Sequence, residues 1–433
     1  MKSPRGSLGV AMVAACPFPA NHGSPASIRE MSAALARRGH RVHVVTYPMH
    51  EPLPVGEVTV HRVGGFLRKR PIKVGPTYYK PLLDLLMVFA LVRCIRRERL
   101  DVIHAHNYEG ALIGYAAKRL TGRPLLYNAV CTMEDELPGY GFIKPRALAV
   151  ALARGLDTFV PRGADQVTVV SEELRTFLTA RGVKPGRITL VPAGVNPEMF
   201  DGADPEALRR RFGLGRAPLV MYTGTLDGFQ RVDYLVRAMG RVAARVPDAR
   251  LVLALNLGSE DDRARVLAQA RELGIEDRIV VVQPAPLDEL PTILAAADVT
   301  VAPRPACPGF PVKLLNYMAA GKPIVTFEGS AKGLRHRETA YLTKDHDWEG
   351  LAQGMITLLE DRPMAARMGE RARGDIMGRL DWPSLAERIE GVYRRMLPPE
   401  DGREPVLASS AGPPARAKRA RRAKPKIPRR SPS

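Results

Sequence analysis

The chain has 433 residues, of which 45% are hydrophobic and 25% are charged. This length exceeds what one hydrophobic core usually organises, and the composition excludes a wholly disordered chain, a collagen and a small disulfide-stapled protein. The formal net charge is +20, and residues 401–433, with ten basic and two acidic side chains, contribute +8 of it. The remaining excess favours anionic partners without choosing among phosphate-bearing substrates, acidic lipids and nucleic acid.

The first predicted elements are a strand, a helix and a second strand. Residues 8–16 are an apolar run, residues 25–38 have the apolar spacing of an amphipathic helix, and residues 41–46 read RVHVVT. The apolar run near the N-terminus has the character of a signal peptide. We interpret it as a buried strand, because a predicted helix and a second predicted strand follow it directly. Further predicted strands lie at 101–105, 124–127 and 166–170. Apolar strands that alternate with helices indicate a parallel sheet covered on both faces.

A second set of alternating strands and helices follows. Its predicted strands lie at 218–222, 250–255, 278–282, 298–302 and 323–327, and its predicted helices at 231–246, 260–273 and 287–296. Between the two sets, residues 192–217 are rich in Pro, Gly and charge, as linkers are. The sequence therefore predicts an α/β protein with two Rossmann-like, doubly wound domains.

The chain divides into four predicted segments. Residues 1–195 form a first domain, residues 196–382 a second, and residues 383–397 a closing amphipathic helix. Residues 398–433 are rich in Pro, Ala, Ser and Arg and lack apolar periodicity. This basic C-terminal tail is predicted to be disordered, because it cannot bury enough apolar surface to fold alone.

Two loops leave predicted strands at the edge where α/β sheets bind ligands. In PFPANHGS, Gly23 and Ser24 come at a helix start, whose free N–H groups favour an anion. In YTGTL, Gly224 and Thr225 form the turn, and Arg231 lies at the start of the next predicted helix. The alternatives are an ordinary turn and a solvated arginine. Neither loop is G-x-G-x-x-G, so a nicotinamide cofactor is unsupported.

The most informative stretch is 303–325, PRPACPGFPVKLLNYMAAGKPIV. Its middle predicts a helix over 310–319 that ends at Gly321. Lys313 lies near the start of this helix, where a positive charge opposes the helix dipole. An anionic ligand beside Lys313 would explain that position, and a surface lysine whose stem packs on apolar neighbours is the alternative.

Several segments, taken in order, resemble the family 4 glycosyltransferases of GT-B fold over about residues 8–397. They are PFPANHGSPASIREMSAALARRGHRVHVVT, DVIHAHNYEG, VTVVSEEL, ITLVPAGVNPEMF, YTGTLDGFQRVDYLVRAM and PVKLLNYMAAGKPIV. The resemblance implies two domains that face a cleft, and a metal-independent enzyme that moves a sugar from a nucleotide-diphosphate donor to an acceptor with retention of configuration. It implies a UDP- or GDP-linked co-substrate and no cofactor or metal.

The resemblance also implies a set of donor contacts on the two walls of the cleft. The candidate donor-binding residues are Gly23, Ser24, Gly224, Thr225, Arg231, Gln283, Lys313 and Asn316. The physical chemistry agrees, because a leaving nucleoside diphosphate gains negative charge that Lys, Arg and helix N-termini can offset.

Some positions depart from the family pattern. Two glutamates that many relatives carry in the donor helix are replaced by Pro308 and Asn316, and Asn316 can hydrogen-bond hydroxyls without bearing charge. Val130 stands where many relatives have His, and Thr225 and Gln230 stand where they have Arg and Lys. These departures make a non-catalytic homologue the alternative interpretation.

Polar residues follow the predicted strand at 101–105, at the edge where ligands bind. His106 or Glu109 could orient an acceptor hydroxyl or act as a general base, and Lys313 is the third candidate for a catalytic role. Structural hydrogen bonding explains His104 more simply. No third His or carboxylate has a supporting spacing, so no metal site is predicted.

Residues 68–99 have basic side chains at both ends and an apolar part between them. The apolar part is too short to span a bilayer. It could lie on an anionic membrane surface or pack as a helix on the first sheet. The basic tail would attract acidic lipids or other polyanions. A polyanion- or nucleic-acid-binding protein is the second functional class, although no nucleic-acid-binding module is found.

The four cysteines are widely separated, with no C-x-x-C pair and no zinc-finger spacing to histidine. This usage favours a reducing compartment. We therefore expect a cytoplasmic protein, peripheral to the inner face of the membrane. Its acceptor could be a sugar, a lipid-linked saccharide, a polysaccharide, a small metabolite or a protein.

Overall fold

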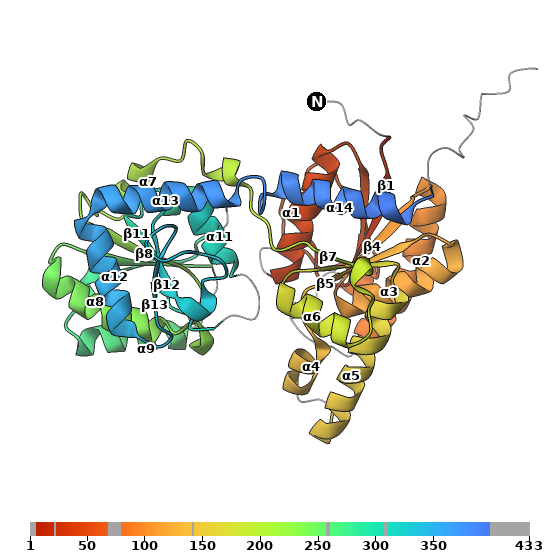
Figure 1. The fold of residues 1–433 in the computed structure, drawn as a ribbon, viewed down its shortest axis with the longest axis horizontal. Helices are drawn as coiled ribbons and strands as arrows, with labels where there is room; N and C mark the ends of the chain where they lie inside the picture. The colour runs from red at the N-terminus through yellow and green to blue at the C-terminus, as the bar shows by residue number, and fades with distance from the viewer. Residues whose placement is uncertain are drawn as a thin grey trace, which may run out of the picture. The chain divides into compact units, whose positions relative to one another are not determined.

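The computed structural model describes residues 6–20, 23–67, 79–140, 143–256, 260–286, 288–306 and 311–398. Two parallel sheets organise these residues, one in each half of the chain (Figure 1). The predicted α/β class with two Rossmann-like domains is confirmed. The described residues before Pro398 form one compact unit, and the predicted boundaries inside it stay predictions. The predicted disordered tail lies, from residue 399 on, outside the described residues.

The first sheet has seven parallel strands in the order β3-β2-β1-β4-β5-β6-β7. They are β1 (Gly9–Ala14), β2 (Arg41–Thr46), β3 (Thr59–Arg62), β4 (Val102–His106), β5 (Leu125–Ala129), β6 (Gln166–Val169) and β7 (Ile188–Leu190). The direction of winding reverses between β1 and β4, and doubly wound sheets bind ligands beyond the carboxyl ends of the strands at such a reversal. The apolar run at the start of the chain is the fully buried β1, as predicted.

Helices cover both faces of this sheet. They are α1 (Gly23–Arg37), α2 (Lys80–Glu98), α3 (Asn107–Thr121), α4 (Met133–Glu136), α5 (Arg146–Gly163) and α6 (Glu172–Ala180). Leu83 and Leu91 of α2 and Ile113 of α3 belong to the core on one face, and Ile28 and Leu35 of α1 belong to the core on the other. Both faces are therefore buried, which explains the near-continuous apolar strands.

The last described helix, α14 (Trp382–Met396), packs on the first domain. It lies beside α1 in Figure 1, and its Leu385 and Tyr393 join the core beneath α1. The helix predicted over 383–397 thus covers the sheet formed by the beginning of the chain.

The second sheet has six parallel strands in the order β10-β9-β8-β11-β12-β13. They are β8 (Leu219–Gly224), β9 (Arg250–Leu255), β10 (Ile279–Val282), β11 (Val299–Ala302), β12 (Ile324–Phe327) and β13 (Tyr341–Thr343). Its helices are α7 (Pro205–Arg211), α8 (Val232–Arg245), α9 (Glu260–Glu272), α10 (Leu290–Ala295), α11 (Val312–Ala319), α12 (Trp348–Glu360) and α13 (Arg362–Ile376). The winding reverses between β8 and β11, so the loops after these strands mark the expected ligand edge.

Sequence patterns missed β3, β7 and β13, which are edge strands of three or four residues. Strands this short show too little alternation for a periodicity to be recognised. The apolar part of 68–99 forms α2, whose buried Leu83, Met87 and Leu91 face the sheet. Residues 68–78 lie outside the described residues. Among the helices that the structure describes, none is long and apolar enough to cross a bilayer.

Candidate active site

The turn after β8 is shaped by Gly224. Its φ of +135° lies where L residues are strained, and a Cβ at this position would meet Lys313 Nζ at 3.0 Å. The hydroxyl of the buried Tyr222 donates to the Thr225 carbonyl at 2.6 Å, which holds the turn closed. Glycine is therefore required where β8 opens onto Lys313.

Helix α11 brings Lys313 to this turn. Lys313 Nζ donates to the Tyr222 hydroxyl and to Gln230 Oε1, both at 3.0 Å, and lies 4.1 Å from the centroid of the Tyr222 ring. One turn later, the hydroxyl of the buried Tyr317 accepts the Thr223 backbone N–H at 3.0 Å. Because residues four apart share a helix face, this bond orients the face of α11 that carries Lys313.

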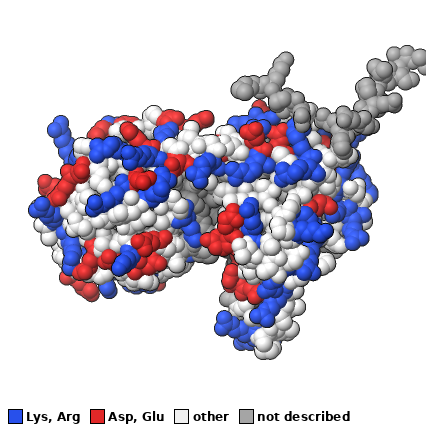
Figure 2. Space-filling view, viewed as in Figure 1, with Lys and Arg blue, Asp and Glu red and all other residues white. Residues whose placement is uncertain are grey.

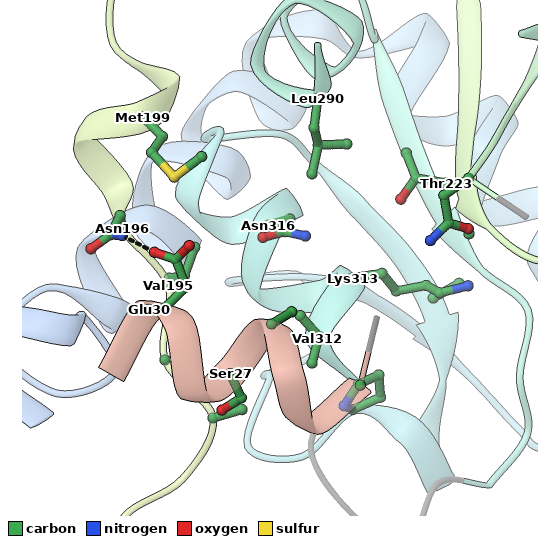
Figure 3. Close-up of a pocket in the computed structure, with 18 of the residues that line it drawn as sticks. Ser27, Glu30, Val195, Asn196, Met199, Thr223, Leu290, Val312, Lys313 and Asn316 are labelled. Atoms are coloured by element: carbon green, nitrogen blue, oxygen red, sulfur yellow. Dashed lines mark hydrogen bonds between the residues drawn. The ribbon is translucent and has the colours of Figure 1, made fainter. Parts of the chain in front are cut away.

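A pocket of about 480 Å³ lies over this turn and helix. Figure 3 shows Asn316 and Lys313 on α11, with Ser27 and Glu30 of α1 across from them. The predicted donor contacts that line it are Gly23, Gly224, Thr225, Lys313 and Asn316. The volume is within the range of pockets that hold small molecules and cofactors. The structure thus brings together residues from both halves of the sequence.

The α1 wall of the pocket begins at Gly23. Gly23 has a φ of +47°, and no atom lies within 4 Å of a Cβ built on it. Further along α1, Glu30 Oε2 accepts Asn196 Nδ2 at 2.6 Å and Glu30 Oε1 accepts Arg29 Nη2 at 3.0 Å (Figure 3 shows the first bond). The carboxylate of Glu30 is therefore compensated, and the helix start remains available to an anion.

Three predicted donor contacts do not line the pocket. Arg231 donates from Nε and Nη2 to the two carboxylate oxygens of Asp233, both at 2.9 Å, and its guanidinium stacks 3.6 Å from the Tyr234 ring centroid. Ser24 Oγ donates to an asparagine side chain of α3 at 3.3 Å. Gln283 precedes the pocket-lining loop and is not part of the lining. Their donor roles stay predictions. Pro308, which replaces a glutamate of many relatives, lies outside the described residues.

His106 is buried at the end of β4 and does not line the pocket. Its Nδ1 accepts the amide of Asn128 at 3.1 Å, and Asn128 Oδ1 accepts Thr168 Oγ1 at 3.0 Å. Its ring stacks on His104 with centroids 4.5 Å apart, and His104 Nδ1 lies 2.7 Å from the Tyr393 hydroxyl of α14. Burial lowers the pKa of His106 to about 3, so the ring is neutral at neutral pH. The structural interpretation of His104 fits this network, and the catalytic role of His106 stays a prediction.

Glu109 lies in the first turn of α3 and also outside the pocket lining. Its Oε1 accepts Lys80 Nζ at 2.8 Å. Nearby, the Tyr47 hydroxyl donates to Asp84 Oδ1 at 2.5 Å, and burial together with Glu109 raises the pKa of Asp84. Burial and Glu109 likewise raise the pKa of the Cys16 thiol to about 12. Glu109 is therefore one member of a polar cluster beside the carboxyl end of β1.

Sequence reasoning missed several residues of the lining. Arg304 donates from Nε to the Ala306 carbonyl at 2.7 Å, and its guanidinium lies 4.8 Å from the Phe229 ring centroid. Its place two residues after β11, at the ligand edge of the sheet, was a signal that could have found it. Ser330 Oγ and Trp382 Nε1 are buried without a hydrogen-bond partner among the described residues, and both residues border the pocket. No local pattern marks these two.

Comparison with known families identifies the chain. A family model described as a glycosyl transferase 4-like domain matches residues 22–194, and one described as glycosyl transferases group 1 matches residues 204–375. Together they cover most of the chain, including every strand of the two sheets except β1. The chain belongs to the family 4 glycosyltransferases. The predicted family and enzyme class are confirmed, and the non-catalytic alternative gains no support.

Curated relatives extend over nearly the whole glycosyltransferase. A D-inositol 3-phosphate glycosyltransferase of Acidothermus cellulolyticus is 28% identical over 394 residues, which are 86% of this chain and 85% of the relative. An N-acetyl-alpha-D-glucosaminyl L-malate synthase of Bacillus anthracis is 25% identical over 397 residues, 88% of this chain and 96% of the relative.

Solved structures share the fold of this glycosyltransferase. A sucrose-phosphate synthase of Thermosynechococcus elongatus superposes with a TM-score of 0.71 at 21% identity, covering 90% of this chain and 99% of that one. HepE of Anabaena, in complex with UDP and glucose, superposes with a TM-score of 0.67 at 19% identity, covering 90% of this chain and all of that one. These likenesses confirm the GT-B fold.

Proposed function

We propose that this glycosyltransferase binds a UDP- or GDP-linked sugar in the pocket over α11 and transfers the sugar, with retention of configuration, to an acceptor hydroxyl. The observation that carries the proposal is the convergence of Lys313, the Gly224 turn and the start of α1 on one pocket. All three are features that bind phosphate oxygens.

The diphosphate of the donor fits the second-domain wall of the pocket. Lys313 Nζ lies beside Gly224, where the lack of a side chain lets a phosphate approach the ammonium group. The backbone N–H groups at the start of α11 are not capped by a side chain, and Pro311 and Val312 line the pocket there. When the bond from the sugar to the diphosphate breaks, these fixed positive ends offset the growing charge on the leaving oxygens.

The same lining supports transfer without a metal ion or other cofactor. Glu30 is the single carboxylate among the described lining residues, and it already bonds Asn196 and Arg29. Divalent cations that bridge phosphates are usually held by carboxylates. Lys313 and Arg304 would supply the positive charge instead.

The donor is tested by calorimetric titration of UDP, GDP and ADP, each with and without EDTA. We expect one of the three nucleotides to bind more tightly than the other two, with a Kd that EDTA leaves unchanged. NMR of the product formed from the matching nucleotide sugar should show the anomeric configuration of the donor. Binding of none of the three nucleotides would overturn the donor-site assignment, and binding that EDTA abolishes would overturn the metal-independent mechanism.

The acceptor is proposed to bind over the carboxyl ends of the first sheet, near the cluster that contains Lys80 and Glu109. The predicted acceptor classes are a sugar, a lipid-linked saccharide, a polysaccharide, a small metabolite and a protein. Curated relatives are named for inositol 3-phosphate and malate, which are small metabolites. The carboxylate of Glu109 is the more exposed side of the Lys80–Glu109 pair, and it can accept hydrogen bonds from a hydroxyl-rich acceptor. Product formation from the bound donor, measured with one acceptor of each class, distinguishes them.

We also propose that the enzyme works at the cytoplasmic face of a membrane. One stripe of α2 exposes Leu82, Leu85 and Phe89 and continues into the exposed Arg93 and Arg96. Residues spaced in this way share one helix face, and an apolar stripe that ends in basic side chains is typical of a helix lying on anionic lipids. The other face of α2 packs on the sheet, so both predicted roles of this segment are compatible.

Membrane association is tested by sedimentation with vesicles of phosphatidylcholine, with and without phosphatidylglycerol. We expect binding that needs the anionic lipid and falls about tenfold or more in Leu85→Asp/Phe89→Asp. Leu273→Asp, at an exposed leucine of the second domain, is the matched control. Equal binding by both variants would remove α2 from the proposed membrane surface.

The basic tail offers a second, separable source of polyanion binding. Figure 2 shows basic and acidic side chains interleaved over the visible face, which does not favour a broad nucleic-acid track there. Deletion of residues 401–433 should abolish binding to a short DNA duplex and leave sugar transfer unchanged. Loss of transfer in this truncated protein would contradict the separation.

A further inference from the structure

A cluster of metal-binding side chain types lies in the first domain, away from the sugar-transfer pocket. His43 is on β2, His61 is on the neighbouring edge strand β3, and Cys94 is on α2, which covers this face of the sheet. His43 and Cys94 are buried, and His61 is half-buried. None of them lines the pocket.

The geometry of the cluster is close to that of a coordination sphere. His43 Nδ1 and His61 Nε2 are 3.0 Å apart, and the two rings are stacked with centroids 5.3 Å apart and planes inclined by 13°. The two nitrogens and Cys94 Sγ all lie within 4.8 Å of one another. Two nitrogens bound to one tetrahedral zinc ion, each at about 2.0–2.1 Å, are separated by about 3.3 Å. The histidine pair therefore needs only a small adjustment to bind the same ion.

The backbone explains why these side chains meet. Val45 pairs with His61 across the β2–β3 ladder, so His43 and His61 are diagonal neighbours two residues apart in register. Residues two apart on a strand share a face, so both rings point toward α2. The core residues around them include Val45, Leu91 and Ile95, which hold the helix and the strands at this separation. The site is thus set by three elements whose positions the core fixes.

Glu98, one helical turn after Cys94 on α2, is the candidate for a fourth ligand, and its carboxylate is not among the atoms that already lie within 4.8 Å of one another. Positions four apart lie on the same helix face. Burial lowers the pKa of His43 and of His61, and the negative charge of Glu98 opposes this shift. For Cys94, burial and the charge of Glu98 both raise the pKa. Its carboxylate is paired with Arg97 at 3.3 Å, an ion pair in which the arginine is 73% exposed. Exposed pairs of this kind contribute little, so Glu98 can turn toward a cation at small cost.

The protonation states suit imidazole ligands. Burial lowers the pKa of His43 and of His61, so both rings are neutral and can present a nitrogen lone pair at neutral pH. Burial raises the pKa of the Cys94 thiol to about 11, which keeps the thiol protonated until a cation displaces its proton. Without a cation, one neutral ring donates to the other across the 3.0 Å contact.

We propose that His43, His61 and Cys94 bind one Zn²⁺ ion, with Glu98 completing a tetrahedral set. The ion forms bonds to His43 Nδ1, His61 Nε2, Cys94 Sγ and a Glu98 oxygen. The S–H proton passes to solvent, and the ring that had donated across the pair gives up the proton on its metal-binding nitrogen and takes one from solvent on its other nitrogen, so that it stays neutral. No electron is transferred.

The ion would fasten the edge strand β3 to α2. β3 has four residues, of which none is fully buried, and it is bonded to the sheet only through β2. A cation that binds the folded state alone stabilises it by mass action. The expected role is structural, and it is independent of the metal-free sugar transfer proposed above.

Cobalt substitution tests the site on the full chain, without a histidine tag, after treatment with a chelator and a thiol reductant. We expect one equivalent of Co²⁺ to bind, with the visible bands of tetrahedral cobalt and a near-ultraviolet thiolate-to-cobalt band. Cys94→Ser should lose the thiolate band, whereas Cys131→Ser, at a half-buried cysteine outside the cluster, should keep it. Equilibrium dialysis with Zn²⁺ should show at least about 100-fold weaker binding by His61→Asn.

A second measurement guards against variants that simply misfold. Zn²⁺ should raise the Tm of the wild type and of Cys131→Ser and leave that of His61→Asn unchanged, while the metal-free Tm of His61→Asn stays near the wild-type value. The proposal is overturned if wild-type protein shows no thiolate band with Co²⁺, or if that band persists in Cys94→Ser. Unchanged Zn²⁺ affinity in Glu98→Gln would remove Glu98 from the ligand set.

Discussion

The two Rossmann-like domains present different kinds of residues at the carboxyl ends of their strands. In the second domain, the turn after β8 and the helix after β11 place Gly224, Lys313 and Asn316 in one pocket. In the first domain, the end of β4 carries His106 and the first turn of α3 carries Glu109, but His106 is buried and Glu109 is paired with Lys80. The same sheet edge therefore yields an open pocket in one domain and an internal hydrogen-bond network in the other.

This contrast shows which sequence signals identify a site. Loop glycines and helix starts act through the backbone, whose direction follows from the order of strand, turn and helix. A histidine at the end of a strand acts through its side chain, and its role depends on what packs over that face. Here Tyr393 of α14, from the far end of the chain, contacts His104, and the ring of His104 stacks on that of His106.

The largest effect is expected for Lys313→Ala. Loss of one charged hydrogen bond to the diphosphate should weaken nucleotide binding by about 1.5–3 kcal/mol, or roughly 10- to 150-fold in Kd. Calorimetric titration of the nucleotide that binds the wild type measures the change. Lys344→Ala, at an exposed lysine outside the pocket, is the matched control. An unchanged Kd in Lys313→Ala would place the diphosphate elsewhere.

A smaller effect is expected for Gly224→Ala. The positive φ makes any side chain strained, by about 1–3 kcal/mol, and the new Cβ would push Lys313 Nζ away from its hydrogen bonds. We expect a lower free energy of unfolding in urea and a raised nucleotide Kd. Gly228→Ala, in the same loop but with open space around it and no positive φ, should change neither. Equal results for the two variants would contradict the role given to the turn.

The buried state of His106 predicts a pH effect on stability. The pKa of His106 falls from 6.5 in the unfolded chain to about 3 in the folded protein, so the unfolded chain binds the additional proton between these values. Stability should therefore decrease as pH falls below about 6.5, by up to about 1.4 kcal/mol per pH unit for one such group. Urea unfolding at pH 7 and pH 5 should show a smaller difference in His106→Asn than in the wild type. The same pH dependence in both proteins would mean that His106 titrates in the folded state, as a general base could.

The smallest effect is expected for Arg231→Ala. Its guanidinium is engaged with Asp233 and Tyr234 and does not line the pocket, so nucleotide Kd should change by less than about threefold. The comparison with Lys313→Ala in the same titration separates the two cations. A tenfold loss in Arg231→Ala would show that the arginine leaves Asp233 to bind the donor.

Much of the fold and a smaller part of the site can be predicted from the sequence. Alternating apolar strands and amphipathic helices marked both sheets, and the Gly224 turn and Lys313 were recognised as parts of one donor site. Arg304 was missed although it follows a strand at the ligand edge. Ser330 and Trp382 could not have been found, because they reach the pocket from distant segments and no local spacing points to them.

The sequence by itself determined the parallel sheets, the family and the backbone anion-binding features, because periodicity, glycines and helix starts act over a few neighbouring residues. The tertiary structure decided which side chains share a space. It directed Arg231 to Asp233, covered His104 with α14, and brought the side chains of His43, His61 and Cys94 close to one another. The physical reason is that side-chain contacts are set by the packing of elements far apart in the chain, which no local pattern encodes.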